Sequence, residues 1–338
     1  MTSAPTAKFA PAATTPQTVP PMSSTPQISN SNSVSSPEPA IANHISVCIC
    51  TFKRPEPLKR LLDDLAEQQT GGLFTYSLVV VDNDPQRSGE HICNDFVRRR
   101  SRPSLTYCMQ PEQSIALTRN KAIEVATGDF IAFIDDDEFP VNSWLLDLYR
   151  TCTSMQVAGV LGPVKRHFDQ QPPKWIVKGK FFERPTHPTG YVMKWPETRT
   201  GNVLFRREIL DAGVLPFRPQ FRGGSDVDFF RLRMEKGHRF VWCNEAVVYE
   251  TIPPARWARR YMLRRALLRG IGAALRREGF FGTLKSIIAV PLYTLGLPFA
   301  LLLGHHRFMI LLIKTCDHLG KVLRLVGFNP IKDAYVTD

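Results

Sequence analysis

The sequence lacks the paired cysteine spacing of a zinc site. Its seven cysteines are scattered, odd in number and form no CxxC pair, so a zinc site is not expected. Several of them stand in apolar runs, and Cys48 and Cys50 point to the same face of an expected strand. The prediction is therefore reduced, buried thiols in a cytosolic compartment.

Other common signals are also missing. The chain shows no basic-then-apolar signal peptide and no repeat of fixed period. It also lacks the GxGxxG fingerprint, so a dinucleotide fold of the usual kind is disfavoured. Residues 1–43 have almost no charge and consist largely of Pro, Ser, Thr and Ala. They cannot bury enough apolar surface to fold, so we predict a disordered tail there.

Strand and helix signals alternate after this tail. Compact apolar or β-branched runs predict strands at residues 45–51, 76–82 and 129–135. Leucines at helical spacing predict a helix after Pro55, and a second helix is expected over residues 114–126. This β-α-β-α-β order predicts an α/β fold with a mostly parallel sheet and helices on its faces.

The stretch FIAFIDDDEFP, residues 130–140, runs an apolar segment straight into four adjacent carboxylates. Such neighbours repel one another and resist ionising together unless something positive sits among them. A bound cation would explain the run. The alternative is an acidic turn after a strand, because Asp favours turns.

Polar groups follow each of the three expected strands. They are Thr51 with Lys53 and Arg54, then Asp82, Asn83 and Asp84, then Asp135, Asp136 and Asp137. Ligands of open α/β sheets bind outside the carboxyl ends of the strands, so the three clusters should converge in space. The acidic run is then part of a site rather than an isolated turn.

Five blocks of the sequence, in order, resemble the inverting glycosyltransferases of family 2: SVCICTFKRPEPLKRLLDDL, VVVDND, ALTRNKAIEVATGDFIAFIDDDE, RTGNVLFRREIL and GGSDVDFFRLRMEKGHRFVWCNEAVVYE. Within the family the chain looks most like bacterial enzymes that build exopolysaccharide or lipid-linked saccharides. The resemblance implies a GT-A fold, a nucleotide-sugar donor and a divalent metal, Mg²⁺ or Mn²⁺. It also implies a transferase domain at residues 44–252, with a nucleotide-binding half (44–140) and an acceptor half (141–252).

The resemblance carries the family's donor site onto matching positions of this chain. It places nucleotide and donor contacts at Thr51, Lys53, Arg54, Asp82, Asn83, Arg119, Asp135, Asp136, Gly201 and Asn202. Asp135 and Asp137 bracket the family's DxD motif and are the implied metal ligands. Simpler interpretations stay open, because Asp82 can end a strand and Arg119 can be a charge on a helix surface.

The family needs a carboxylate to take the proton of the acceptor hydroxyl, and the resemblance puts Asp226 at that position. Ser225 replaces the Glu that commonly precedes this Asp, which makes Asp228 a rival base. A cap of the following helix is the structural alternative for Asp226. Processive members carry QxxRW. The PPARW of this chain keeps Arg256 and Trp257 as candidate acceptor or diphosphate contacts but disfavours polymerisation by one enzyme.

Residues 253–338 are expected to form a basic and apolar helical region at a membrane. Eight arginines stand between Arg256 and Glu278 against one glutamate, and residues 286–304 follow without a charge. That run can just cross a bilayer, and its two prolines equally suit an element that dips into one leaflet. A pair of buried helices in a soluble domain is the alternative. Arginines before the apolar run favour the cytoplasmic face.

The expected function is inverting, metal-assisted transfer of one sugar from a nucleotide-sugar donor to a lipid-linked or cell-surface saccharide acceptor. Asp226 is the expected general base, and the expected location is the cytoplasmic face of the cell membrane. Membrane lipid is an expected partner, whereas nucleic acid is not, because the arginines lead into an uncharged run. Two alternatives remain: a polyprenyl-phosphate sugar transferase of the same fold, and a catalytically silent nucleotide-sugar-binding or scaffold protein.

Overall fold

The computed structural model describes residues 43–221, 224–275 and 280–328. The chain divides into the units Met1–Ala40 and Ile41–Asp338, and every described element belongs to the second unit. The tail predicted at residues 1–43 lies outside the described residues, apart from Asn43.

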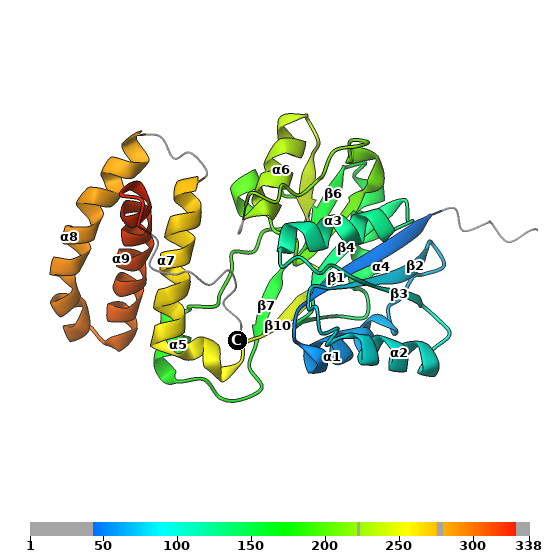
Figure 1. The fold of residues 1–338 in the computed structure, drawn as a ribbon, viewed down its shortest axis with the longest axis horizontal. Helices are drawn as coiled ribbons and strands as arrows, with labels where there is room; N and C mark the ends of the chain where they lie inside the picture. Colours follow the sequence, from blue (N-terminus) through cyan, green and yellow to red (C-terminus); the bar gives the residue numbers. More distant parts are fainter. Residues whose placement is uncertain (1–42, 222–223, 276–279, 329–338) are drawn as a thin grey trace, which may run out of the picture. The chain divides into compact units, whose positions relative to one another are not determined.

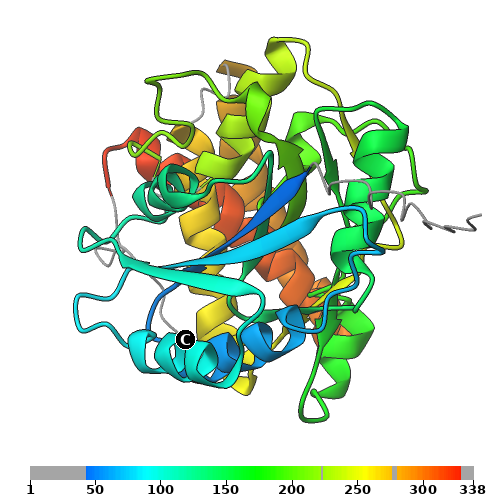
Figure 2. The same cartoon turned by 90° about the vertical axis from the view of Figure 1, so that its right-hand side faces the viewer.

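A seven-stranded sheet forms the centre of the second unit (Figures 1 and 2). In spatial order its strands are β3 (Ser104–Met109), β2 (Thr75–Asp82), β1 (His44–Thr51), β4 (Phe130–Asp135), β8 (Asn202–Arg206), β6 (Gly159–Leu161) and β9 (Phe240–Trp242). The first four run parallel, whereas β8 is antiparallel to both of its neighbours. The mostly parallel α/β sheet predicted from the sequence is therefore confirmed.

A smaller sheet adjoins the acidic run. Its three strands, in spatial order, are β5 (Glu138–Pro140), β10 (Val248–Thr251) and β7 (Val164–His167). β5 begins three residues after the end of β4, and Glu250 of β10 lies opposite Glu138 in the antiparallel register. The acidic run is thus the junction between the two sheets, which brings a further carboxylate from a distant part of the chain.

Helices cover both faces of the large sheet. On one face lie α1 (Pro55–Leu65), α2 (Glu90–Arg99) and α4 (Trp144–Ser154); on the other lie α3 (Ile115–Val125) and α6 (Ser225–Glu235). Alternate residues of β1 serve the two cores, because side chains along a strand point to opposite faces. Val47 and Ile49 belong to the core with α1, whereas Cys48 belongs to the core with α3.

The sequence prediction passed over α2 and β3. The first is polar, with only Ile92, Cys93 and Phe96 buried, and the second has no fully buried residue. β3 is an edge strand of the large sheet, so its side chains lack the continuous apolar run of the strands that were predicted.

All seven cysteines are free, and four of them are buried, which agrees with the expectation of reduced thiols.

Three long helices follow the two sheets. They are α7 (Arg259–Leu275), α8 (Phe280–Leu302) and α9 (His305–Leu325), and α9 packs against both of the others (Figure 1). Gly270 allows the close approach of α7 and α9, since a Cβ there would lie 2.1 Å from the Asp317 carbonyl oxygen. Trp257 lies in the 3-10 turn that precedes α7, Pro254–Trp257.

α8 exposes most of its apolar side chains. Among the described residues, Leu284–Leu302 is the segment long and apolar enough to cross a membrane, by length and composition, and 17% of it is buried. Its exposed residues include Ile287, Ile288, Leu292, Leu295, Phe299 and Leu302. α8 is therefore not the buried core helix that the sequence left open.

Candidate active site

The carboxyl ends of β1, β2 and β4 meet at one edge of the large sheet, as expected. Thr51 pairs with Asp82 in the register of β1 and β2, and Cys50 pairs with Asp135 in the register of β1 and β4. The Thr51 hydroxyl donates a hydrogen bond of 2.8 Å to Asp136 Oδ2. The structure thus brings the three polar clusters together.

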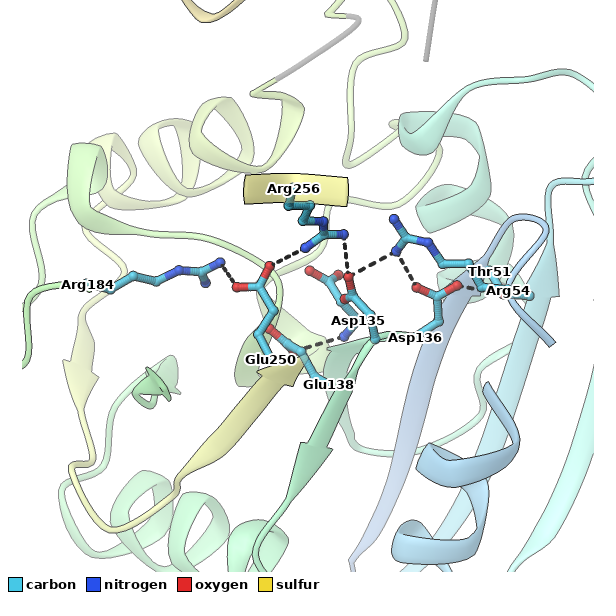
Figure 3. Close-up of polar contacts among 9 residues, drawn as sticks. Thr51, Arg54, Asp135, Asp136, Glu138, Arg184, Glu250 and Arg256 are labelled. Carbon is cyan, nitrogen blue, oxygen red and sulfur yellow. Dashed lines mark hydrogen bonds and ion pairs between the residues drawn. The ribbon is translucent and has the colours of Figure 1, made fainter. Parts of the chain in front are cut away.

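Two arginines contact the acidic run (Figure 3). Arg54, the residue before α1, donates to Asp136 Oδ1 at 3.0 Å and to Asp137 Oδ2 at 3.1 Å. Arg256 donates to the same oxygen of Asp137 at 2.7 Å and to Glu250 Oε1 at 2.9 Å. These guanidinium groups supply the positive charge that adjacent carboxylates require. Burial nevertheless raises the pKa of Asp136 above its usual range, against the opposing effect of Arg54.

Arg184 extends this network on the side of β10. It pairs with Glu250 Oε2, so Glu250 bridges Arg184 and Arg256 (Figure 3). Arg184 lies in the basic, aromatic segment 174–185. The helix of this segment, α5 (Lys174–Gly179), packs on α9.

Asp135 lies at the open side of the cluster. Its backbone N–H donates to Glu138 Oε2 at 3.1 Å, but its carboxylate has no hydrogen-bond partner in the described part of the chain. Asp135 is exposed as a residue, yet the surrounding protein displaces enough water to raise the pKa of its carboxyl group to about 6, despite the nearby Arg119. Burial also raises the pKa of Glu138, with Asp135, Asp137 and Glu250 adding to the effect.

Asp135 and Asp137 offer the hard oxygen ligands that Mg²⁺ and Mn²⁺ prefer. Within the described ranges, no group of three or more His, Cys, Asp or Glu side chains is arranged to hold a metal ion by itself. Mg²⁺ in transfer enzymes is commonly bound by one or two carboxylates together with substrate phosphates. The donor set therefore fits a cation that arrives with a diphosphate and does not fit an all-protein metal cage.

Asp82 and Asn83 organise the loop that follows β2. The fully buried Asp82 accepts hydrogen bonds from the backbone N–H groups of Asp84 and Gly89, at 2.9 and 2.7 Å, and from the Tyr107 hydroxyl at 3.1 Å. Asn83 bonds backbone groups of residues 110, 112 and 114. Both residues thus lie at the strand end where they were expected, with their side chains bonded to the protein itself.

Gly201 and Asn202 lie on the opposite side of the acidic run. A Cβ on Gly201 would lie 2.8 Å from Glu138 Oε1 and 2.9 Å from Asp135 Oδ2, so only glycine fits against these carboxylates without a shift. Asn202 is fully buried, donates to the carbonyl groups of Pro163 and Ala246, and accepts from Trp144 Nε1. It fixes the start of β8 at the site.

Arg119 and Lys53 occupy the two flanks of the site. Arg119 of α3 donates to Ser225 Oγ at 3.3 Å and lies over the Phe217 ring. This contact joins α3 to the start of α6, so Arg119 is more than a charge on a helix surface. Lys53 is exposed, with a positive φ of 55° in the turn that leads into α1.

The two candidate bases have different surroundings on α6. Asp226 is partly buried in the first turn, and its carboxylate has no hydrogen-bond partner among the residues that the structure describes. The N-cap position belongs to Gly224, so Asp226 does not cap the helix. Asp228 is buried and accepts from Arg218 and Arg231. Its burial would raise its pKa, but these hydrogen bonds outweigh that effect and lower it.

Sequence reasoning missed the roles of Glu138, Arg184 and Glu250, and of Arg199, which lies beside Gly201. Glu138 stood in the acidic run that was singled out, but no spacing rule connects it with Arg184. Glu250 ends the last matching block and becomes a neighbour only through the pairing of β10 with β5. These contacts depend on the topology of the small sheet and not on a local pattern.

The fold and site together define an α/β protein whose candidate ligand site, at the strand ends, combines carboxylates and arginines. Comparison with known proteins makes the class specific. The family described as Glycosyl transferase family 2 matches residues 46–213. The succinoglycan biosynthesis protein ExoM of Rhizobium meliloti is 32% identical over 232 residues, which cover 67% of this chain and 73% of ExoM. The chain therefore belongs to glycosyltransferase family 2.

Two further similarities are more distant. The glycosyltransferase AglE of Haloferax volcanii is 24% identical over 60% of this chain and 65% of its own length. Among solved structures, the mannosyltransferase PcManGT from Pyrobaculum calidifontis, in complex with GDP-Man and Mn²⁺, gives a TM-score of 0.52 at 17% identity, covering 85% of this chain and 73% of that one. This likeness supports the GT-A fold that the resemblance implied.

Proposed function

We propose that this glycosyltransferase moves one sugar, with inversion, from a nucleotide-sugar donor to a saccharide acceptor in polysaccharide assembly. The observation that carries the proposal is the cluster at the sheet edge, where Asp135 and Asp137 lie among arginines. The relation to ExoM, a succinoglycan biosynthesis protein, supports an exopolysaccharide or lipid-linked saccharide as the acceptor class.

The arginines of the cluster suit the diphosphate of such a donor. Arg54 and Arg256 both contact Asp137 Oδ2, so a diphosphate next to Asp137 would lie within reach of two guanidinium groups, which bind phosphate bidentately. A divalent cation, Mg²⁺ or Mn²⁺, held by Asp135 and Asp137 would neutralise charge on the departing diphosphate. Thr51 and Arg54 hold Asp136 in place beneath this site.

Asp226 is the general base in this proposal. A base must be free to accept a proton from the acceptor hydroxyl, and Asp226 has that freedom among the described residues, whereas Asp228 is bound by two arginines. The contact between Arg119 and Ser225 holds the start of α6 beside the donor site. A base on the opposite side of the sugar from the leaving group gives inversion in a single displacement, as in inverting glycosidases.

The C-terminal helices place the enzyme at the cytoplasmic face of the membrane in this proposal. The exposed apolar residues of α8 would enter the lipid, and the exposed arginines of α7, among them Arg260 and Arg265, would meet lipid phosphates. A lipid-linked acceptor would then be held close to the sheet edge. We propose residues 253–338 as this membrane-associated region.

The direct test is ligand-induced protection of the purified full chain against thermal unfolding by UDP-, GDP- and dTDP-sugars, with and without Mn²⁺. One nucleotide class should protect the wild type in a Mn²⁺-dependent manner, and Asp137→Ala should lose that protection. Asp95→Ala, at an exposed carboxylate of α2, is the matched control and should behave as the wild type. If no nucleotide sugar protects the wild type under any condition, the proposal is wrong.

A further inference from the structure

Arg199 differs from the other arginines of the site. It is partly buried, yet it forms no hydrogen bond or ion pair with any residue of the described ranges. Arg233 shows the usual arrangement: its buried guanidinium donates to the Ile209 carbonyl oxygen at 2.9 Å and to Asp211 Oδ2 at 2.7 Å. Within the described ranges, Arg199 is thus a cation without a direct partner.

Arg199 has charged neighbours both on the acidic run, at Glu138, and on α6, at Asp226. Gly201, two residues further on, lies against the carboxylates of Asp135 and Glu138. Burial lowers the pKa of Arg199, the neighbouring Arg184 adds to this effect, and Asp226 is the strongest of the carboxylates that oppose it. The guanidinium is therefore close enough to Asp226 for an electrostatic interaction, although the two groups are not hydrogen-bonded.

Such an arrangement is unfavourable for folding alone. An arginine stays protonated in proteins, and partly removing its charge from water without a direct partner costs free energy. The nearby Arg184 adds repulsion. Polar groups left in this way are concentrated at functional sites, where a ligand completes them. The ligand that would satisfy a guanidinium is an anionic oxygen, since Arg pairs best with carboxylate or phosphate.

We propose that Arg199 binds an anionic oxygen of the substrate, in the space between Asp135 and Asp226. This inference rests on the proposed function, because it takes that space to be where the transferred sugar lies. The anionic oxygen can come from the donor diphosphate or from a carboxylate on the transferred sugar. In the second case Arg199 also helps determine which donor the enzyme accepts.

The test measures binding of three probes to wild type, Arg199→Gln and Arg199→Lys by titration calorimetry in the presence of Mn²⁺. The probes share the nucleotide base identified by thermal protection: the nucleoside diphosphate, a neutral nucleotide sugar and the corresponding nucleotide uronate. Loss of a hydrogen bond to a charged group predicts about 10- to 150-fold weaker binding for Arg199→Gln, with partial recovery in Arg199→Lys. Equal losses for all three probes assign Arg199 to the diphosphate, whereas a loss confined to the uronate assigns it to a sugar carboxylate.

Two controls separate binding from structure. Arg239→Gln removes the same charge from an exposed position and should leave binding unchanged. Arg199→Gln should keep or raise the melting temperature, whereas Arg233→Gln should lower it. If the wild type binds a nucleotide sugar and Arg199→Gln binds all three probes equally well, this inference is wrong and the proposed function stands. If the wild type binds none, the proposed function fails and this inference fails with it.

Discussion

Replacing Arg256 tests how much its ion pairs at the acidic run stabilise the fold. Its guanidinium bonds Asp137 and Glu250, and the side chains of these three residues are only 7%, 12% and 13% exposed. Removing one partner of a buried ion pair typically costs about 3–5 kcal/mol, because the other charge stays buried. After Arg256→Gln, Asp137 keeps Arg54 and Glu250 keeps Arg184, so we expect the lower end, about 3 kcal/mol.

This loss corresponds to a fall in melting temperature on the order of 5–10 °C for a domain of this size. Differential scanning fluorimetry of the full chain would measure it. Lys59→Gln is the matched control, because it breaks an exposed pair with Asp63, at 3.1 Å on α1, that is worth about 0.3–0.5 kcal/mol. Arg256→Lys should give an intermediate value, since a single ammonium cannot reproduce the forked contact.

A shift for Arg256→Gln no larger than that of Lys59→Gln would refute the reasoning. It would mean that the carboxylates of the junction are hydrated or protonated in the free protein and do not depend on Arg256. In that case the contacts between Arg256, Asp137 and Glu250 would have no more effect on stability than a surface ion pair.

Three further outcomes are expected. Asp226→Asn should lower kcat by about 10²- to 10⁴-fold with little change in melting temperature, whereas Asp228→Asn should mainly destabilise the fold, since it weakens the hydrogen bonds with Arg218. Metal affinity should fall as the pH is lowered through about 6, where Asp135 takes up a proton. The double variant Leu295→Glu with Phe299→Glu should bind anionic lipid vesicles at least about 100-fold more weakly, because both side chains are exposed on α8.

Each of these outcomes has its own control. For the base, equal kinetic losses in both variants at unchanged stability would remove the distinction between Asp226 and Asp228. For the pH profile, Asp135→Asn should abolish the change in metal affinity near pH 6. In the metal-free wild type, the raised carboxyl pKa values should also make the fold more stable as the pH falls through 6, and melting curves at different pH values will show this. For α8, Val97→Glu, at an exposed apolar residue of α2, should leave vesicle binding unchanged.

The parallel half of the fold could be predicted because its signals are local. The strands that begin at His44 and Thr75 are continuous apolar runs, and the four buried leucines of α1 recur at helical spacing. The convergence of Thr51, Asp82 and Asp135 followed from one rule, that ligand groups gather at the carboxyl ends of parallel strands. Short apolar runs bounded by turns were enough for this half.

The arginine network could not be predicted, because its members are distant in sequence and obey no period. Arg184 lies in a loop, Glu250 in a short strand and Arg256 in a 3-10 turn, and they meet only when β10 pairs with β5 and β7. Asp228 is a further residue whose role the sequence alone could not settle. Its sequence context made it a rival base, and only the contacts of Arg218 and Arg231 show that its carboxylate is already bound.

The charges at the junction argue for one more property, coupled binding of cation and diphosphate. The five carboxyl groups of Asp135, Asp136, Asp137, Glu138 and Glu250 lie near four guanidinium groups. Arg54, Arg184 and Arg256 form ion pairs within this set, whereas Arg199 is close without a direct pair among the described residues. A divalent cation alone would be repelled by these arginines, and a diphosphate alone by these carboxylates. Bound together, the two ligands nearly cancel each other's charge.

Mn²⁺ should therefore raise the affinity for the nucleoside diphosphate, and the diphosphate should raise the affinity for Mn²⁺ by the same factor, as linkage requires. A coupling of about 5- to 150-fold is expected from typical values, measured by calorimetric titration of each ligand at saturating and zero concentration of the other. Arg256→Gln should raise the affinity for Mn²⁺ alone and lower the affinity for the diphosphate alone, because Arg256 repels the cation and attracts the phosphate groups. Independent binding of the two ligands would show that Asp135 and Asp137 do not hold the cation next to the diphosphate, and the metal site would then have to lie elsewhere.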